Sequence, residues 1–178
     1  MTEIALVSRS AAQTRRLGER IGRALAAGDV VLLQGELGAG KTVLAQGIGR
    51  GLDVTAAIKS SSFVLVNEYA GRLRLYHADL YRLEDPREVF DLALEETAKD
   101  GVLVVEWPER AWEELPRERL LVRLAYGATP SERRIDLVAE GARYEALLKR
   151  LRLRATSRGA RSPSRPAPSG SRRRRSTS

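Results

Sequence analysis

Residues 30–42 of the chain read VVLLQGELGAGKT. The first four residues are a continuous apolar run without alternation, which is typical of a strand buried on both faces of a sheet. The eight residues from Gly35 to Thr42 then fit the pattern G-x-x-x-x-G-K-[ST] at every fixed position. Such a loop opens a helix, which we expect over residues 41–51. This strand–loop–helix unit predicts an α/β domain built around a phosphate-binding loop.

The residue types in this loop suit the binding of phosphate groups. Glycines at 35, 38 and 40 allow tight turns and a close approach of the backbone to phosphate oxygens, and the helix that follows adds the positive end of its dipole. Lys41 places a positive charge near the terminal phosphates, and the Thr42 hydroxyl is a hard ligand suited to Mg²⁺. The guanine signature N-K-x-D is missing, which favours ATP over GTP. The predicted binding residues for ATP are Gly35, Glu36, Leu37, Gly38, Ala39, Gly40, Lys41 and Thr42.

Two acidic residues that follow apolar strands are candidates for holding Mg²⁺ and orienting water. Glu106 follows the run VLVV at 102–105, which is the Walker B pattern, and Asp79 follows LYHA at 75–78. The alternative is that each of them only caps a strand in solvent. With Lys41 they form the predicted catalytic set, and Thr42 and Glu106 form the predicted metal set. His77 is the only histidine, and we interpret it as an ordinary strand residue.

The rest of the chain predicts one P-loop NTPase-like domain over residues 1–154, with a mixed parallel and antiparallel sheet flanked by helices. Hydrophobic periodicity and turn residues define its elements. We expect an edge strand at 4–7, a helix at 11–27 with a Ser10–Gln13 capping box, a hairpin of strands 63–69 and 73–78, a broken helical stretch at 86–99, a strand at 102–105, a hairpin of strands 120–125 and 135–139, and a closing helix around 144–151.

The net charge of +8 comes from one end of the chain. Residues 149–178 contain 11 basic and no acidic residues, which leaves 20 basic against 23 acidic residues elsewhere. From Ala155 onward only Ala, Thr, Ser, Arg, Gly and Pro occur, so we expect a disordered tail over 155–178. Because it lacks aromatic residues, any contact with RNA through Arg172–Arg175 would be weak and electrostatic. The alternative is a solubilising tail.

Composition excludes several classes of protein. Without cysteine the chain has no disulfides and no Cys-ligated metal sites. No stretch approaches the roughly 20 apolar residues of a membrane span, and the N-terminus has no signal-peptide run. We therefore expect a cytoplasmic protein without membrane contact.

Four motifs of the chain occur in a characteristic order: GELGAGKT (35–42), KSSSFVLVNEY (59–69), YHADLYRLEDPREV (76–89) and VEWPER (105–110). Together they resemble the TsaE (YjeE) family of bacterial ATPases, which support threonylcarbamoyladenosine formation in tRNA. The resemblance covers roughly residues 3–150, and the H-x-D-L-Y-R-L and V-E-W-P blocks are its specific part. It implies that the protein acts on a complex of TsaD and TsaB, with tRNA as an indirect partner.

The resemblance also implies roles for single residues. Thr42 binds Mg²⁺, Glu106 belongs to the Mg²⁺ shell, and Asp79 is a catalytic or water-orienting acid. Trp107 lies close to the nucleotide, Ser10 and Thr14 face the base or ribose, and an arginine of the last hairpin, Arg133 or Arg134, approaches the nucleotide. The chain departs from the family at Ser60-Ser61-Ser62, where Ser-Pro-Thr is usual.

A small-molecule kinase is the alternative function, because any P-loop can support phosphate transfer to an acceptor. Such kinases normally carry a lid with several arginines, and the body of the sequence contains no clear lid.

Overall fold

The computed structural model describes residues 2–59 and 65–158. Its strands are β1 (Thr2–Ser8), β2 (Asp29–Gly35), β3 (Val66–Tyr69), β4 (Arg74–Asp79), β5 (Gly101–Glu106), β6 (Arg119–Tyr126) and β7 (Arg133–Glu140). Its α-helices are α1 (Ala11–Ala24), α2 (Lys41–Gly51), α3 (Arg87–Asp91), α4 (Leu94–Thr97) and α5 (Ala142–Arg158). Short 3₁₀ turns occupy Ala98–Asp100, Pro108–Arg110 and Trp112–Glu114.

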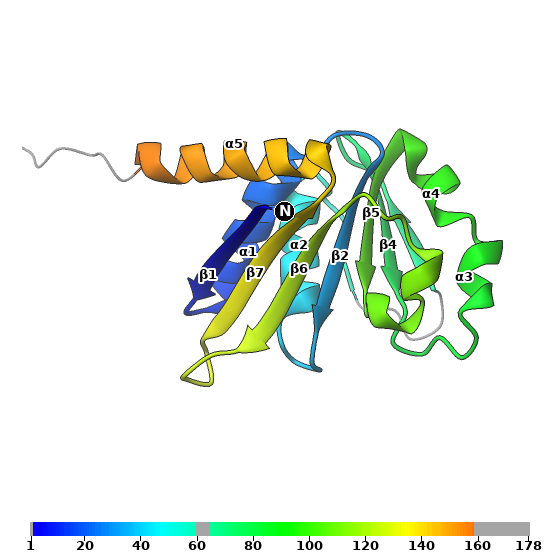
Figure 1. Cartoon of the computed structure of the whole chain (residues 1–178), viewed down its shortest axis with the longest axis horizontal. Coiled ribbons are helices and arrows are strands. Elements are labelled where there is room, and N and C mark those ends of the chain that lie inside the picture. The colour runs from blue at the N-terminus through cyan, green and yellow to red at the C-terminus, as the bar shows by residue number, and fades with distance from the viewer. Residues whose placement is uncertain (1, 60–64, 159–178) are drawn as a thin grey trace, which may run out of the picture.

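The strands form one seven-stranded mixed sheet in the order β1-β7-β6-β2-β5-β4-β3 (Figure 1). Strand β2 pairs in parallel with β5 and β6, and β4 pairs in parallel with β5. Strands β3 and β7 pair antiparallel with their neighbours. The mixed sheet, the edge position of β1 and both hairpins are therefore confirmed, although β3 begins at Val66 and residues 63 and 64 of the expected strand lie outside the described residues. Because β2, β4 and β5 run in the same direction, the loops that follow them meet at one edge of the sheet.

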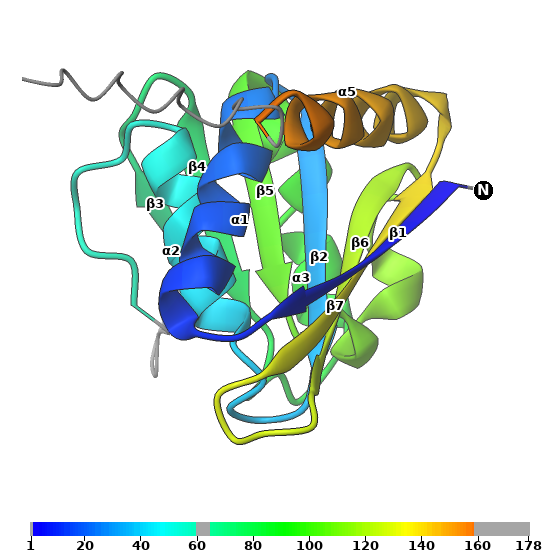
Figure 2. The same cartoon turned by 90° about the vertical axis from the view of Figure 1, so that its left-hand side faces the viewer.

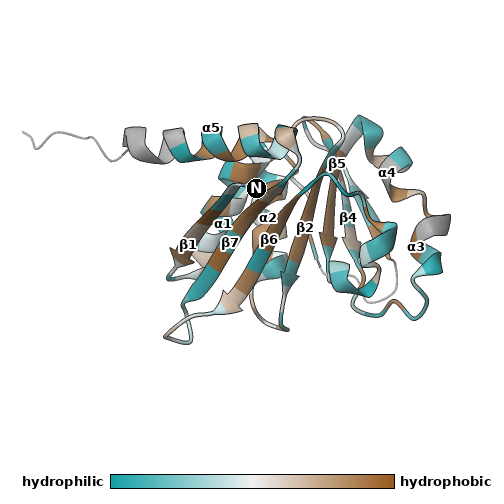
Figure 3. Ribbon diagram, in the orientation of Figure 1, coloured by the Kyte–Doolittle hydropathy of each residue, from teal (hydrophilic) through white to brown (hydrophobic). Residues whose placement is uncertain are grey.

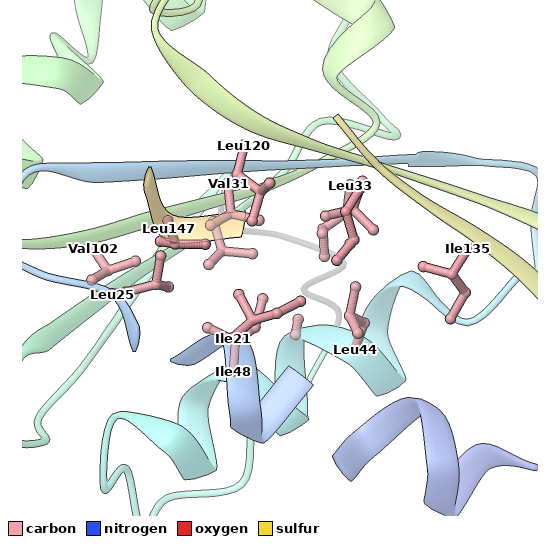
Figure 4. Close-up of a cluster of buried hydrophobic side chains, with 14 of the residues drawn as sticks. Ile21, Leu25, Val31, Leu33, Leu44, Ile48, Val102, Leu120, Ile135 and Leu147 are labelled. Atoms are coloured by element: carbon pink, nitrogen blue, oxygen red, sulfur yellow. The ribbon is translucent and has the colours of Figure 1, made fainter. Parts of the chain in front are cut away.

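The central strands of the sheet are hydrophobic along most of their length (Figure 3). Helices cover the sheet on both faces, and successive side chains of β2 point to opposite faces, so β2 contributes to a hydrophobic core on each side. Val31 and Leu33 pack in a cluster with residues of α1, α2 and α5 (Figure 4). Val30 and Leu32 pack in a second cluster with residues of α3 and α4. All four side chains are almost fully buried, so the sequence correctly indicates a strand with two buried faces.

Helices α1 and α2 lie side by side on the same face of the sheet (Figure 2). They cross through pairs of glycines, Gly18 and Gly22 on α1 and Gly47 and Gly51 on α2. A Cβ atom added to Gly47 would lie 2.2 Å from the carbonyl oxygen of Arg15 and 2.9 Å from Cα of Gly18. This close approach holds α1 against α2 and places it beside the phosphate loop.

Helix α2 has the expected bounds, whereas α1 begins where expected but ends earlier. Oγ of Ser10 caps α1 by accepting from the backbone amide of Gln13, which confirms one half of the capping box. In the other half, Oε1 of Gln13 accepts from the backbone amide of Arg9, one residue before the N-cap, rather than from that of Ser10. The helix ends at Ala24 rather than at residue 27, because Leu25 is extended and the Asp29 carboxylate binds the Ala26 amide in a turn.

The predicted break between residues 86 and 99 is confirmed. Ala93 adopts a left-handed conformation between α3 and α4. At the other end of the chain, α5 continues to Arg158, four residues into the segment we interpret as a tail. Residues 159–178 lie outside the described residues, so the boundary at 154 stays a prediction.

Candidate functional site

The phosphate loop connects β2 to α2 with backbone angles that only glycine adopts easily. Gly38 has φ of +76° and Gly40 has φ of +104°. Gly40 is also the N-cap of α2, and no side chain caps this helix. The first amide groups of α2 are therefore free to bind an anion at its N-terminus.

A cleft of about 320 Å³ opens above this helix N-terminus. The parallel pairing places Asp79 opposite Glu106 and Glu106 opposite Leu33, so the ends of β4, β5 and β2 lie together. Residues of the loop and of these strand ends line the cleft: Leu37, Gly38, Gly40, Lys41, Thr42, Val43, Asp79, Tyr81, Glu106 and Trp107. The structure thus brings Lys41 and Thr42 together with both predicted acids.

Lys41 is buried, and its amino group is held by the loop itself. Nζ donates to the carbonyl oxygens of Gly35 (2.6 Å) and Glu36 (2.9 Å), and it lies 3.7 Å from the centroid of the Trp107 ring. Burial lowers the pKa of Lys41, and the nearby carboxylates of Glu106, Glu109 and Asp79 oppose this shift. The amino group faces the same space as the α2 amides, so both attract a polyphosphate.

The acidic side of the cleft is organised by hydrogen bonds. Oγ1 of Thr42 donates to Oε2 of Glu106 over 3.0 Å, and Oε1 of Glu106 lies 2.9 Å from Nε2 of His77. Oδ1 of Asp79 accepts from the backbone amide of Tyr81 over 3.1 Å. Sequence reasoning missed the contact of His77, although His77 and Asp79 have the i, i+2 spacing that puts two side chains on one face of a strand.

The residues present fit Mg²⁺ only as a partner of bound phosphate. Among the described residues, no group of three His, Cys, Asp or Glu side chains could hold a metal ion. The oxygens of Thr42 and Glu106 supply two hard donor groups at one point. Mg²⁺ is usually held by one or two protein oxygens together with phosphates and water, so this donor set suits a magnesium–nucleotide complex.

Trp107 lies at the edge of the cleft in a strained conformation. Its φ of 59° and ψ of 49° are unusual for a bulky residue, and the following Pro108 disfavours the ordinary helical alternative. The ring packs against Tyr81 at a centroid distance of 4.8 Å and covers the amino group of Lys41. Trp107 therefore contacts the phosphate loop through Lys41.

The tip of the β6–β7 hairpin holds the outer side of the phosphate loop (Figure 2). The Arg133 guanidinium donates to the carbonyl oxygens of Ala39 (3.1 Å) and Gly38 (3.2 Å). The hydroxyl of Tyr126 donates to the carbonyl oxygen of Leu37 (2.6 Å). Arg134, the other candidate arginine, is exposed. Arg133 thus contacts the carbonyl side of the loop, and its approach to a nucleotide stays a prediction.

Neither Ser10 nor Thr14 lines the cleft. Ser10 caps α1. Thr14 is buried, its hydroxyl lies 2.8 Å from that of Ser8, and its Cγ2 lies 4.0 Å from the position of a Cβ on Gly40. Their predicted place near the base or ribose stays a prediction. Residues 60–62, where the chain departs from the family motif, lie outside the described residues.

The chain is similar to known proteins over most of its length. The family model "Threonylcarbamoyl adenosine biosynthesis protein TsaE" matches residues 8–135. A tRNA threonylcarbamoyladenosine biosynthesis protein TsaE from Nostoc sp. is 47% identical over 133 residues, which are 71% of this chain and 80% of that protein. The protein of the same name from Bacillus subtilis is 44% identical over 126 residues, covering 70% of this chain and 78% of its own length.

A solved structure has the same fold. The crystal structure of Bacillus subtilis YdiB superposes with a TM-score of 0.72 at 33% sequence identity, covering 86% of this chain and 97% of that chain. Among the described residues, no helix is long and apolar enough to cross a membrane.

Proposed function

The chain belongs to the TsaE family of threonylcarbamoyl adenosine biosynthesis proteins, and from this premise we propose that it is a Mg²⁺-dependent ATPase. Its hydrolysis of ATP would support the threonylcarbamoyladenosine modification of tRNA. The observation that carries the proposal is the convergence of the uncapped N-terminus of α2, Lys41, Thr42 and Glu106 on one cleft.

Binding of the nucleotide rests on the loop and on Lys41. The free amides of α2 bind phosphate oxygens, and Lys41 exchanges the carbonyl oxygens of Gly35 and Glu36 for the terminal phosphates. Thr42 and Glu106 hold Mg²⁺, which neutralises charge on the phosphates.

Hydrolysis rests on the two acids at the strand ends. Asp79 lies opposite Glu106 in the sheet and lines the cleft, where its carboxylate orients the attacking water. Such groups act mainly on the transition state, because the loop and Lys41 already hold the ground-state phosphates.

Family membership supports a proposal for the partners. TsaD-like and TsaB-like proteins form the complex on which the ATPase acts, and tRNA is involved through that complex. The basic C-terminal segment adds a weak electrostatic contact with RNA at most.

The test compares ATP hydrolysis by the full chain alone with hydrolysis after addition of TsaD and TsaB from the same organism. We expect hydrolysis to rise when both partners are present, and a pull-down with ATP to recover both. Phosphate transfer to a small-molecule acceptor without any partner would instead support the kinase alternative.

A further inference from the structure

His77 is a buried histidine that contacts Glu106 but does not line the cleft, and the proposed chemistry leaves it unused. Its side chain is 1% exposed, and its Nε2 lies 2.9 Å from Oε1 of Glu106. Nδ1 has no hydrogen-bond partner among residues 2–59 and 65–158. The imidazole therefore has a single polar contact in the described structure, and that contact is with the predicted metal-shell carboxylate.

The sheet register explains why this contact forms. Tyr76 and Ala78 of β4 pack in the core cluster on the side of α3 and α4. His77 and Asp79 alternate with them, so they point to the face that carries α2. On the neighbouring strand β5, His77 is paired with Val104, and Glu106 lies two residues further along the same face. The Glu106 carboxylate thus lies between the imidazole on one side and the hydroxyl of Thr42 on the other.

The chemistry of the three groups defines the direction of the bonds. An ionised carboxylate only accepts hydrogen bonds, so the Thr42 hydroxyl donates to one oxygen and Nε2–H of His77 donates to the other. A neutral imidazole with its proton on Nε2 has a bare lone pair at Nδ1. This tautomer leaves no N–H group of His77 without a partner, in agreement with the surroundings of Nδ1.

We propose that His77 is a positioning residue that fixes the Glu106 carboxylate in the orientation needed for Mg²⁺ at Thr42. This inference rests on the proposed function. Residues that orient a metal ligand through a hydrogen bond typically change metal affinity or activity by roughly 10–100-fold when removed. Without His77, Glu106 would keep its charge but lose one of the two bonds that orient it.

A histidine that only fills space would behave differently under substitution. His77→Leu introduces an apolar side chain of similar bulk and removes the Nε2–H donor. His77→Gln keeps an N–H donor near the place of Nε2, whereas His77→Asn places its donor one bond nearer the backbone. Tyr76→Phe is the matched control, because it removes the 2.8 Å hydrogen bond from Tyr76 to Asp100 on the opposite face of the same strand.

The experiment titrates Mg²⁺ into the full chain with ATP and measures the Mg²⁺ concentration for half-maximal ATP binding by calorimetry. We expect His77→Leu and His77→Asn to raise this concentration roughly tenfold or more. His77→Gln should remain within about threefold of the wild-type protein, and Tyr76→Phe should not change it. Circular dichroism establishes that each variant is folded.

The inference is overturned if folded His77→Leu has the wild-type Mg²⁺ requirement, or if His77→Gln is as impaired as His77→Leu. Should His77→Leu fail to fold, the comparison of His77→Gln with His77→Asn tests the proposal. An equal Mg²⁺ requirement for ATP binding in these two variants contradicts it. Absence of Mg²⁺-dependent ATP binding in the wild-type protein would instead overturn the proposed function, and this inference with it.

Discussion

Oγ1 of Thr42 and Oε2 of Glu106 lie 3.0 Å apart, although 64 residues separate them in the sequence. One belongs to the first turn of α2 and the other to the last position of β5. The parallel pairing of β2 with β5 produces this contact, because it places the end of β5 next to the strand that leads into the phosphate loop. The two oxygens define the predicted position of Mg²⁺.

Asp79→Asn and Glu106→Gln keep the shape of each side chain and remove its charge. We expect each variant to hydrolyse ATP at least roughly a hundredfold more slowly, since one preorganised electrostatic group is lost. ATP affinity should change much less, and Glu106→Gln should show the larger change in Mg²⁺ requirement. Hydrolysis is measured with TsaD and TsaB present.

Glu109→Gln is the control for these two acids. Glu109 is exposed and acts on Lys41 only through its charge, without lining the cleft. Its substitution should leave the rate within about twofold, because exposed charges are screened. Wild-type rates in both Asp79→Asn and Glu106→Gln would show that neither acid is catalytic.

Arg133→Ala removes the two bonds that hold the carbonyl oxygens of Gly38 and Ala39. We expect the dissociation constant for ATP to rise by roughly tenfold to a hundredfold, because hydrogen bonds from a charged donor stabilise the ordered loop by about 1.5–3 kcal/mol. Arg134→Ala changes the exposed neighbouring arginine and should leave the dissociation constant for ATP unchanged. Equal ATP affinity in wild-type protein and Arg133→Ala would mean that the hairpin does not support the loop.

Much of this site follows from the sequence alone, because its signals are local. The loop at 35–42, the strand before it and the acids at 79 and 106 are each defined by their neighbours in the chain. The bond from His77 to Glu106 depends on the register of β4 against β5, and apolar runs do not determine that register. The position of Arg133 depends on where the β6–β7 hairpin lies relative to the loop, so the sequence alone left two arginines as alternatives.

The packing of α1 on α2 had a sequence signal that was missed. Glycines recur at spacing i, i+4 in both helices, at 18 and 22 and at 47 and 51, which is the pattern of a close helix crossing. The apolar periodicity of α1 was sufficient to predict a helix but not its partner.

Gly47→Ala should lower the free energy of unfolding by about 1–3 kcal/mol. The added methyl group meets the backbone of Arg15 and Gly18, which cannot move without separating the helices. Gly49→Ala in the same helix is the matched control, because its methyl group meets mainly Cδ1 of Ile58, the terminal atom of a side chain rather than backbone. Urea unfolding measures the stability of both variants, and Gly47→Ala should be the less stable. Equal stability of the two would contradict close packing of α1 on α2 at Gly47.

We expect the protein to lose stability at high pH because of the buried Tyr144. Burial raises the pKa of Tyr144 to about 12, against about 10 in the unfolded chain. The folded state therefore holds the phenol proton of Tyr144 more tightly than the unfolded chain does. The resulting contribution to the free energy of unfolding is complete below pH 10 and is lost as pH rises through about 12. By pH 12 the loss amounts to about 2 kcal/mol.

The test compares the wild-type protein with Tyr144→Phe between pH 8 and pH 12. The variant leaves the buried Val30 amide without its acceptor, which costs about 1–3 kcal/mol at neutral pH. The gap in unfolding free energy between the two proteins should narrow above pH 10. A gap that stays constant up to pH 12 would exclude Tyr144 as the titrating group.

The most direct test of the central claim is calorimetric titration of ATP into the full chain and into Lys41→Ala, with and without Mg²⁺. The account predicts Mg²⁺-dependent binding to the wild-type protein, weaker competition by GTP than by ATP, and loss of binding in the folded variant, because the charge facing the terminal phosphates is gone. Unchanged ATP affinity in Lys41→Ala would contradict the assignment of this cleft as the nucleotide site.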